Sequence, residues 1–217
     1  TLAHEAGHSM HTWYAQRHQT FQDHHYPIFL AEVASTFNEE LLTHHLLGQT
    51  NDPQMKAYLL NRQIDDLRGT IYRQTMFAEF EKIIHQRQEA GEALTLDTLT
   101  KIYRELLLAY FGPDFTIDPQ LDLECLRIPH FYSAFYVYQY ATGMSAAIAL
   151  SRQVLETGDP GRYLGFLQSG GLQYPIDTLK AAGVDMTSPQ PVESALQLFA
   201  QRVDELAQLL NINLDPR

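Results

Sequence analysis

The first residues of the chain form a pattern of side chains that could bind and use a metal ion. His4 and His8 are four positions apart, so one turn of a helix would place both imidazoles on the same face. Two such nitrogens can hold one side of a tetrahedral zinc ion. Glu5, directly after His4, would then be placed to take a proton from a water bound to the metal. The pattern His-Glu-x-x-His therefore predicts zinc-dependent hydrolysis.

A catalytic zinc ion typically has three protein ligands, so a third must come from elsewhere in the chain. Glu32 lies 24 residues beyond His8, an interval that suits a second helix folding back on the first. His11 could serve instead, but a third ligand from the same short helix would strain a tetrahedron. We therefore favour Glu32 and expect His11 to pack or to support a ligand. Glu39, on the same helix stripe as Glu32, either accepts the free N–H of a ligating imidazole or is a solvated helix charge.

Size and composition limit the class of protein. The chain has 217 residues, of which 45% are hydrophobic and 19% charged, and we expect one soluble domain over residues 1–217. A formal net charge of −11 argues against a nucleic-acid partner. No apolar run approaches the roughly 20 residues of a membrane span, so no membrane partner is expected. The single cysteine, Cys125, excludes an internal disulfide and fits a reducing compartment, which predicts a cytoplasmic location.

Hydrophobic periodicity and breaker residues predict an all-α chain. Residues 112–129 contain three prolines and are expected to be irregular or briefly extended. Helices are expected over residues 1–19, 28–47, 54–88 with a kink at Gly69, from Thr95 or Asp97 to Phe111, 130–156, from the turn at 158–160 to 168, 175–182, and from Ser188-Pro189 to 210.

The chain begins abruptly with respect to its candidate metal site. Residue 1 is Thr, and His4 lies only three residues from it. The first turn of a helix frays and lacks capping partners, so it is a poor place for a metal ligand. We therefore expect the sequence to be the carboxy-terminal part of a longer polypeptide.

Residues 130–140 are unusually rich in polar aromatic groups, with His130 and tyrosines at 132, 136, 138 and 140. A tyrosine-rich helix usually belongs to a core. Here, however, more hydroxyl and imidazole groups crowd together than a core would easily satisfy. Tyr O–H or His N–H groups can donate to the oxyanion that develops during peptide hydrolysis. Periodicity does not indicate which of them point at the metal.

Four blocks of sequence, taken together, resemble the oligoendopeptidase F family of zinc metallopeptidases, relatives of thimet oligopeptidase. They are Leu2-Ala3-His4-Glu5-Ala6-Gly7-His8-Ser9-Met10-His11, Phe29-Leu30-Ala31-Glu32-Val33-Ala34-Ser35-Thr36-Phe37-Asn38-Glu39, Ile128-Pro129-His130-Phe131-Tyr132 with Phe135-Tyr136-Val137-Tyr138, and Tyr174-Pro175-Ile176-Asp177 with Ala182-Gly183-Val184-Asp185-Met186-Thr187-Ser188-Pro189.

The resemblance implies the helical, neurolysin-like catalytic domain of an oligopeptidase with a deep channel, one Zn²⁺ ion per chain and short peptide substrates. It also implies a partner, the missing amino-terminal part of the same polypeptide. By this resemblance the family's zinc ligands fall on His4, His8 and Glu32, and its general base falls on Glu5. Its transition-state donors fall on His130, Tyr138 and Tyr132.

Two other classes of protein fit parts of the sequence. The chain could be a catalytically silent zinc-binding fragment that lacks the other wall of the channel. A di-iron carboxylate bundle also uses Glu-x-x-His on helices, but this pattern occurs once, at Glu5–His8, without a second copy. The remaining histidines are interpreted as surface residues, because neighbours on a helix point apart and their flanks are polar: His18, His24, His25, His44, His45 and His85.

Overall fold

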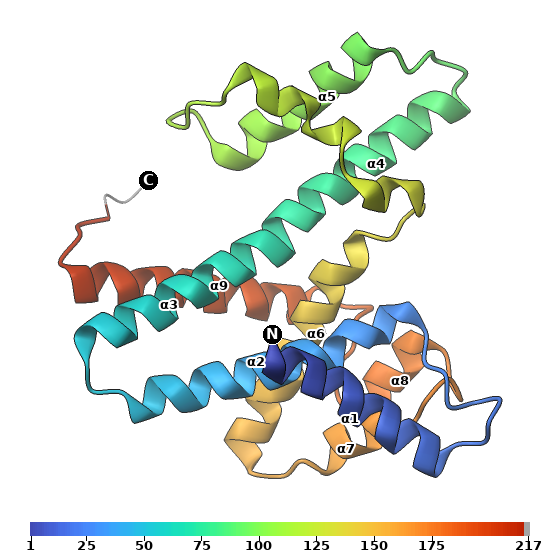
Figure 1. Ribbon diagram of the computed structural model, residues 1–217, viewed down its shortest axis with the longest axis vertical. Helices are drawn as coiled ribbons and strands as arrows, with labels where there is room; N and C mark the ends of the chain where they lie inside the picture. Colours follow the sequence, from blue (N-terminus) through green and yellow to red (C-terminus); the bar gives the residue numbers. More distant parts are fainter. Residues whose placement is uncertain (215–217) are drawn as a thin grey trace. The chain divides into compact units, whose positions relative to one another are not determined.

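The computed structural model describes residues 1–214, and within that range it contains helices and connecting loops but no strand (Figure 1). The all-α prediction is therefore confirmed. The helices are α1 (Leu2–His18), α2 (Ile28–Gln49), α3 (Pro53–Leu67), the π-helical turn η1 (Arg68–Tyr72), α4 (Arg73–Glu89), α5 (Leu96–Phe111), the 3-10 helices η2 (Pro119–Leu126) and η3 (Pro129–Tyr132), α6 (Tyr138–Thr157), α7 (Gly161–Gln168), α8 (Pro175–Ala181) and α9 (Gln190–Leu210).

Several helices begin where a side chain can satisfy a free backbone N–H group. The carboxylate of Asp52 accepts from the amide of Gln54 at the start of α3, where Pro53 occupies the first helical position. Thr95 caps α5 in the same way, through the amide of Thr98. The cap at Thr95 was one of the two predicted starts of this helix.

The chain forms two compact units, and the first comprises Thr1–Arg68 together with the chain from Thr142 onward. In this unit α1 packs on α2 and α7, and α3 packs on α9. Its core is apolar and draws on α2, α6, α7 and α8. The buried residues are Leu30, Val33, Ala34, Phe37, Ala146, Ala147, Leu150, Tyr163, Phe166, Leu167, Leu179, Ala182 and Val184.

The second unit, Gly69–Ala141, has a core of its own, in which α4 and η2 each pack on α5. A buried carboxylate, Glu124, lies at the edge of this core. It accepts hydrogen bonds from the hydroxyl of Tyr103 (2.6 Å) and from the guanidinium groups of Arg73 (2.5 Å) and Arg127 (2.6 Å). These donors compensate for the removal of the carboxylate from water. The adjacent thiol of Cys125 is also buried.

The predicted helix over residues 130–156 is wrong in its first part. The chain instead forms η3, leaves it at Ser133, turns through Phe135 and enters α6 only at Tyr138. Phe135 has a left-handed backbone with φ of 57°, and its N–H donates to the carboxylate of Glu81 (2.7 Å) instead of to a helical carbonyl. A helix cannot continue through such a residue. Upstream, the expected irregular stretch 112–129 contains η2.

The long helical run predicted over residues 54–88 is present, with its interruption at the predicted place. Gly69 lies in η1, a single π-helical turn between α3 and α4. Such turns insert an extra residue into an α-helix and account for a local irregularity without breaking the run.

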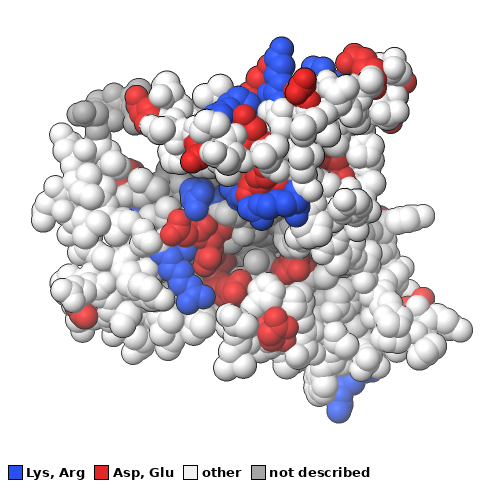
Figure 2. All heavy atoms as spheres, turned by 45° about the horizontal axis from the view of Figure 1, so that its top comes forward, with Lys and Arg blue, Asp and Glu red and all other residues white. Residues whose placement is uncertain are grey.

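Charged groups of both signs lie next to one another on the face drawn in Figure 2. Ion pairs among the described residues include Arg202 with Glu205 (2.8 Å) and Lys180 with Asp185 (3.0 Å). Within residues 1–214 no helix combines the length and the apolar character that crossing a membrane requires.

Candidate functional site

The two histidines of the opening pattern lie on one face of α1. The ring centroids of His4 and His8 are 4.9 Å apart, with the rings nearly perpendicular. Between them, Gly7 is buried against α2: a Cβ atom there would lie 2.4 Å from the carbonyl oxygen of Ala34 and 2.6 Å from the Cα of Ser35. The absence of a side chain thus allows the two backbones to touch, which brings the α2 residue Glu32 within reach of both imidazoles.

The carboxylate of Glu32 faces both rings. Its Oε2 lies 3.4 Å from Nε2 of His4 and 3.7 Å from Nε2 of His8, and all three side chains are partly buried. One ligand atom from each residue lies within 4.8 Å of the other two. Zinc bonds of about 2.0–2.1 Å in a tetrahedron separate neighbouring ligand atoms by roughly 3.3 Å, and the two carboxylate–imidazole distances of 3.4 and 3.7 Å are close to this value. Three protein ligands would leave the fourth position open.

Further groups orient the three candidate ligands. Glu39 lies further along α2 on the same stripe as Glu32. Its Oε2 lies 3.2 Å from Nδ1 of His4, the nitrogen that does not face Glu32. The hydroxyl of Ser35 donates to Oε2 of Glu32 (3.0 Å). The side-chain amide of Asn38 donates to the carbonyl oxygen of Ala3 (3.2 Å), which ties α2 to the start of α1. Such contacts fix the tautomer and the direction of metal-binding side chains.

The remaining residue of the pattern, Glu5, is exposed on α1 beside His4. The structure thus brings His4, His8 and Glu32 together, with Glu39 behind one imidazole and Glu5 on the solvent side of α1.

His11 lies apart from the candidate ligands, in the interior. Its ring is fully buried and stacks on Tyr26 at 3.6 Å, with Phe166 also in contact. Neither ring nitrogen has a hydrogen-bond partner among the described residues. Burial, aided by the charge of His8, lowers the pKa of His11 to about 3. A neutral packing imidazole is one of the two roles expected for it.

The prediction that all six remaining histidines lie on the surface is wrong for His24. Its side chain is only 9% exposed, with Nδ1 within 2.7 Å of the carbonyl oxygen of Phe21. The neighbouring loop explains this burial. The backbone of Gly170 and Gly171 packs closely against residues 23–25. Cβ atoms at these two glycines would lie 2.3 Å from the carbonyl oxygens of Asp23 and His25, respectively.

In the second unit, His130 belongs to an aromatic group that sequence reasoning identified only in part. Its Nε2 lies 3.3 Å from the hydroxyl of Tyr140, and its ring stacks on Tyr136 with centroids 5.6 Å apart. Tyr132 and Tyr138, the two predicted donors, are 91% and 41% exposed. A continuous helix over residues 130–156 would keep Tyr140 away from His130, so the sequence gives no indication of this contact.

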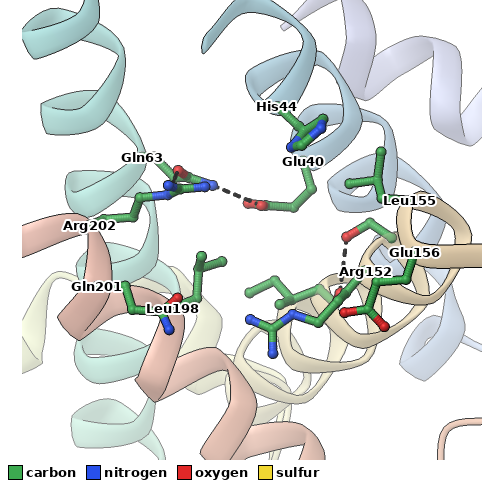
Figure 3. A pocket seen from close by; sticks show the side chains of 11 residues that line it. Glu40, His44, Gln63, Arg152, Leu155, Glu156, Leu198, Gln201 and Arg202 are labelled. Carbon is green, nitrogen blue, oxygen red and sulfur yellow. Dashed lines mark hydrogen bonds between the residues drawn. The ribbon is translucent and has the colours of Figure 1, made fainter. Parts of the chain in front are cut away.

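A polar cavity of about 260 Å³ lies between α2, α3, α6 and α9 in the first unit (Figure 3). Glu40 points into it and accepts from the side-chain amide of Gln63 (2.8 Å), whose oxygen accepts in turn from Arg202 (2.8 Å). Burial raises the pKa of Glu40 to about 7, although the amide of Gln63 and the charge of Arg202 oppose this shift.

Comparison with known proteins identifies the family. Residues 1–198 match the profile of Peptidase family M3. Over 212 residues the chain is 52% identical to Oligopeptidase PepF of Bacillus subtilis (strain 168), covering 97% of this chain and 32% of that protein. It is 45% identical over 211 residues to an Oligoendopeptidase F homolog of Borreliella burgdorferi, covering 96% and 36%.

The fold agrees with that relationship. A crystal structure of oligoendopeptidase-F from Enterococcus faecium superimposes with a TM-score of 0.86 at 43% identity, covering 97% of this chain and 38% of that one. The chain thus spans about a third of the length of the curated relatives it matches. Its profile match and its helical fold both lead to one conclusion: the chain belongs to peptidase family M3.

Proposed function

We propose that residues 1–217 are the catalytic domain of a zinc-dependent metalloendopeptidase that hydrolyses short oligopeptides. The observation that carries the proposal is the meeting of His4, His8 and Glu32, whose possible ligand atoms lie within 4.8 Å of one another, close enough for one metal ion to contact all three. Membership of a peptidase family supports the same conclusion.

In this proposal each residue of the opening pattern has one task. A zinc ion held by His4, His8 and Glu32 would act as a Lewis acid that lowers the pKa of a bound water and polarises the scissile carbonyl. Glu5 takes a proton from the attacking water and then delivers it to the leaving amine. Glu39 would keep His4 in the tautomer that leaves Nε2, the nitrogen facing Glu32, free to bind the metal.

The donors to the developing oxyanion are proposed from the sequence match alone. His130 and Tyr138, with Tyr132 beside them in the same block, match the family's transition-state donors. An imidazole or phenol hydrogen bond that forms only as charge develops lowers the barrier without tightening substrate binding.

The first test measures metal and turnover separately. We expect elemental analysis to find one zinc ion per chain and no iron, and to find the zinc lost in Glu32→Ala. In Glu5→Gln we expect zinc to remain while hydrolysis of a short quenched-fluorescence peptide falls by roughly 10²- to 10⁴-fold. Wild-type turnover in Glu5→Gln would refute the role of Glu5 as the base.

A second candidate is a zinc-binding fragment without activity of its own. It is favoured by the length of the relatives, because this chain corresponds to about a third of them. The partner would then be the remainder of the same polypeptide. Peptide cleavage by this chain, measured beside a full-length relative, distinguishes the two.

A cytoplasmic location is part of the proposal and rests on the use of a single cysteine.

A further inference from the structure

The chain makes an unusual turn between η3 and α6. The N–H of Tyr136 donates to the carbonyl oxygen of Ser133 (3.2 Å), which closes a four-residue turn with Ala134 and Phe135 at its centre. Phe135 has φ of 57°, a left-handed conformation that glycine or asparagine usually adopts at this position. A phenylalanine there is unfavourable by itself, so its surroundings must hold it in place.

Glu81 on α4 supplies that hold. Its side chain is only 2% exposed, and its Oε1 accepts the backbone N–H of Phe135 at 2.7 Å. This distance lies at the short end of the range for N–H···O hydrogen bonds in proteins. A carboxylate buried to this degree needs such a donor, because removing it from water is otherwise costly.

One helical turn further along α4, the ring of His85 packs against the side chain of Phe135. Its ring lies 4.7 Å from the ring of Phe135, and its Nδ1 lies 2.8 Å from the backbone carbonyl oxygen of Glu81. Helix α4 therefore contacts both the backbone and the ring of Phe135. The next residue but one, Val137, is fully buried in the core of the second unit, which anchors the far side of the turn.

The turn connects the two segments that hold the aromatic donors. His130 lies on η3, before it, and Tyr138 begins α6, after it. The stacking of His130 on Tyr136 and its contact with Tyr140 both bridge the turn. The direction in which the chain leaves the turn thus decides where the phenol of Tyr138 lies relative to the imidazole of His130.

We propose that Glu81 is a positioning residue for catalysis: by binding the amide of Phe135 it holds the turn in its left-handed form and so sets the placement of His130 relative to Tyr138. The inference rests on the proposed function, which makes these two side chains oxyanion donors. Glu81 itself does not touch the substrate in this account.

Three substitutions at position 81 separate the acceptor from the packing. Glu81→Gln keeps a neutral acceptor oxygen of the same size. Glu81→Leu keeps the volume but removes the acceptor. Glu81→Ala leaves space in which water can replace the carboxylate, so a folding failure of the leucine variant leaves the test intact. Each zinc-loaded protein is measured for hydrogen exchange of the Phe135 amide, for zinc content and for kcat and KM on a quenched-fluorescence peptide.

We expect the Phe135 amide to exchange about tenfold faster or more in Glu81→Leu and Glu81→Ala, and at nearly the wild-type rate in Glu81→Gln. In the first two variants kcat should fall by roughly 10- to 100-fold, as expected when a reacting geometry shifts by about an ångström. Zinc content and KM should stay close to those of the wild type. The double variant Glu81→Leu/Phe135→Asn should regain part of the lost kcat, because asparagine tolerates the left-handed conformation.

Unchanged exchange and unchanged kcat in both Glu81→Leu and Glu81→Ala would overturn the proposal. So would a loss of zinc and of thermal stability that is equal in all three variants, since that would mark a purely structural role. A wild-type protein that binds zinc but cleaves no peptide would instead refute the proposed function. The exchange rates would still report whether Glu81 holds the turn.

Discussion

The contact between His4 and Glu39 places a carboxylate behind one of the candidate metal ligands. Oε2 of Glu39 lies 3.2 Å from Nδ1 of His4, while Nε2 of the same ring faces Glu32. A carboxylate on the far nitrogen fixes the tautomer and raises the basicity of the ligand. The two roles considered for Glu39 from sequence were a support for an imidazole and a solvated charge, and this geometry favours the first.

Replacing Glu39 should therefore weaken zinc binding. We expect Glu39→Ala to raise the dissociation constant for zinc by roughly 10- to 100-fold, measured by competition with a chromophoric chelator. Glu89→Gln, which changes an exposed carboxylate at the end of α4, is the matched control and should leave the constant unchanged. Equal zinc affinity in the Glu39 variant and the wild type would show that Glu39 is a solvated helix charge that does not support His4.

The buried carboxyl group of Glu40, the neighbour of Glu39, should make the stability of the fold depend on pH. Its pKa is about 7 in the folded protein against a usual value of 4.5, chiefly because of burial. Between these two values the folded chain retains a proton that the unfolded chain releases, so stability falls as the pH rises from about 4.5 to 7. We expect a loss on the order of 1–3 kcal/mol over this window. In Glu40→Gln, which cannot ionise, that loss should be absent.

The measurement compares denaturant unfolding of Glu40→Gln and wild type at pH 5 and at pH 8. Contributions of all other titrating groups are common to both proteins and cancel in the difference. A difference between the two proteins that does not change with pH would show that Glu40 ionises in the folded state as it does in water.

At the scale of the elements, the close contact of α1 with α2 depends on Gly7. A methyl group at position 7 would overlap the backbone of α2 at Ala34 and Ser35, which cannot yield as a flexible side chain would. We expect Gly7→Ala to destabilise the fold by about 1–3 kcal/mol and to weaken zinc binding, because the two helices that hold the candidate ligands must separate.

Gly48 provides the control, since it lies in α2 where a methyl group would have open space. Among residues 1–214, no atom beyond its own helical turn lies within 4 Å of the position that this methyl group would occupy. Gly48→Ala should be neutral or stabilise by up to about 1 kcal/mol. Thermal unfolding and zinc titration of both variants check these expectations. A Gly7→Ala protein as stable as Gly48→Ala would mean that α1 can shift at no cost.

Features of the fold and the candidate site that depend on residues close together in the chain could be predicted from the sequence. Features that depend on contacts between distant residues could not. The two helices of the candidate site were predicted to within two residues at each end, and the spacing of His4 and His8 together with the interval to Glu32 depended only on them. The start of α6 could not be predicted in this way. Phe135 adopts its conformation because of Glu81, 54 residues away, and no pattern within residues 130–140 contains that contact.

The π-helical turn η1 and the burial of His24 were missed for related reasons. An extra residue in a helix changes the hydrophobic period only locally, so the sequence indicated the place, at Gly69, but not the form. His24 is covered by Gly170 and Gly171, which approach closely from far along the chain. The residues next to His24 in the sequence are polar, and this pattern wrongly predicted an exposed side chain.

At the scale of the whole molecule, all three candidate ligands belong to one of the two compact units. A metal that binds only the folded form stabilises it by about 2.7 kcal/mol when its free concentration is 100 times its dissociation constant. We therefore expect zinc removal to speed hydrogen exchange mainly in α1 and α2. Helices α4 and α5 of the other unit, Gly69–Ala141, should change less.

Hydrogen exchange followed by mass spectrometry, with and without a chelator, tests this expectation. The His8→Ala protein should resemble the chelated wild type in α1 and α2, and a chelator should have no further effect on it. A loss of protection in α5 as large as that in α1 would show instead that the metal stabilises both units equally.

The single cysteine of the chain has a practical consequence. Cys125 is 6% exposed, and burial raises the pKa of its thiol to about 11. Alkylating reagents attack the thiolate, which is scarce at neutral pH for such a group. A cysteine introduced at an exposed position such as Phe21, which is 85% exposed, would be alkylated far faster. A fluorophore could therefore be attached at one chosen place with the native sulfur left intact.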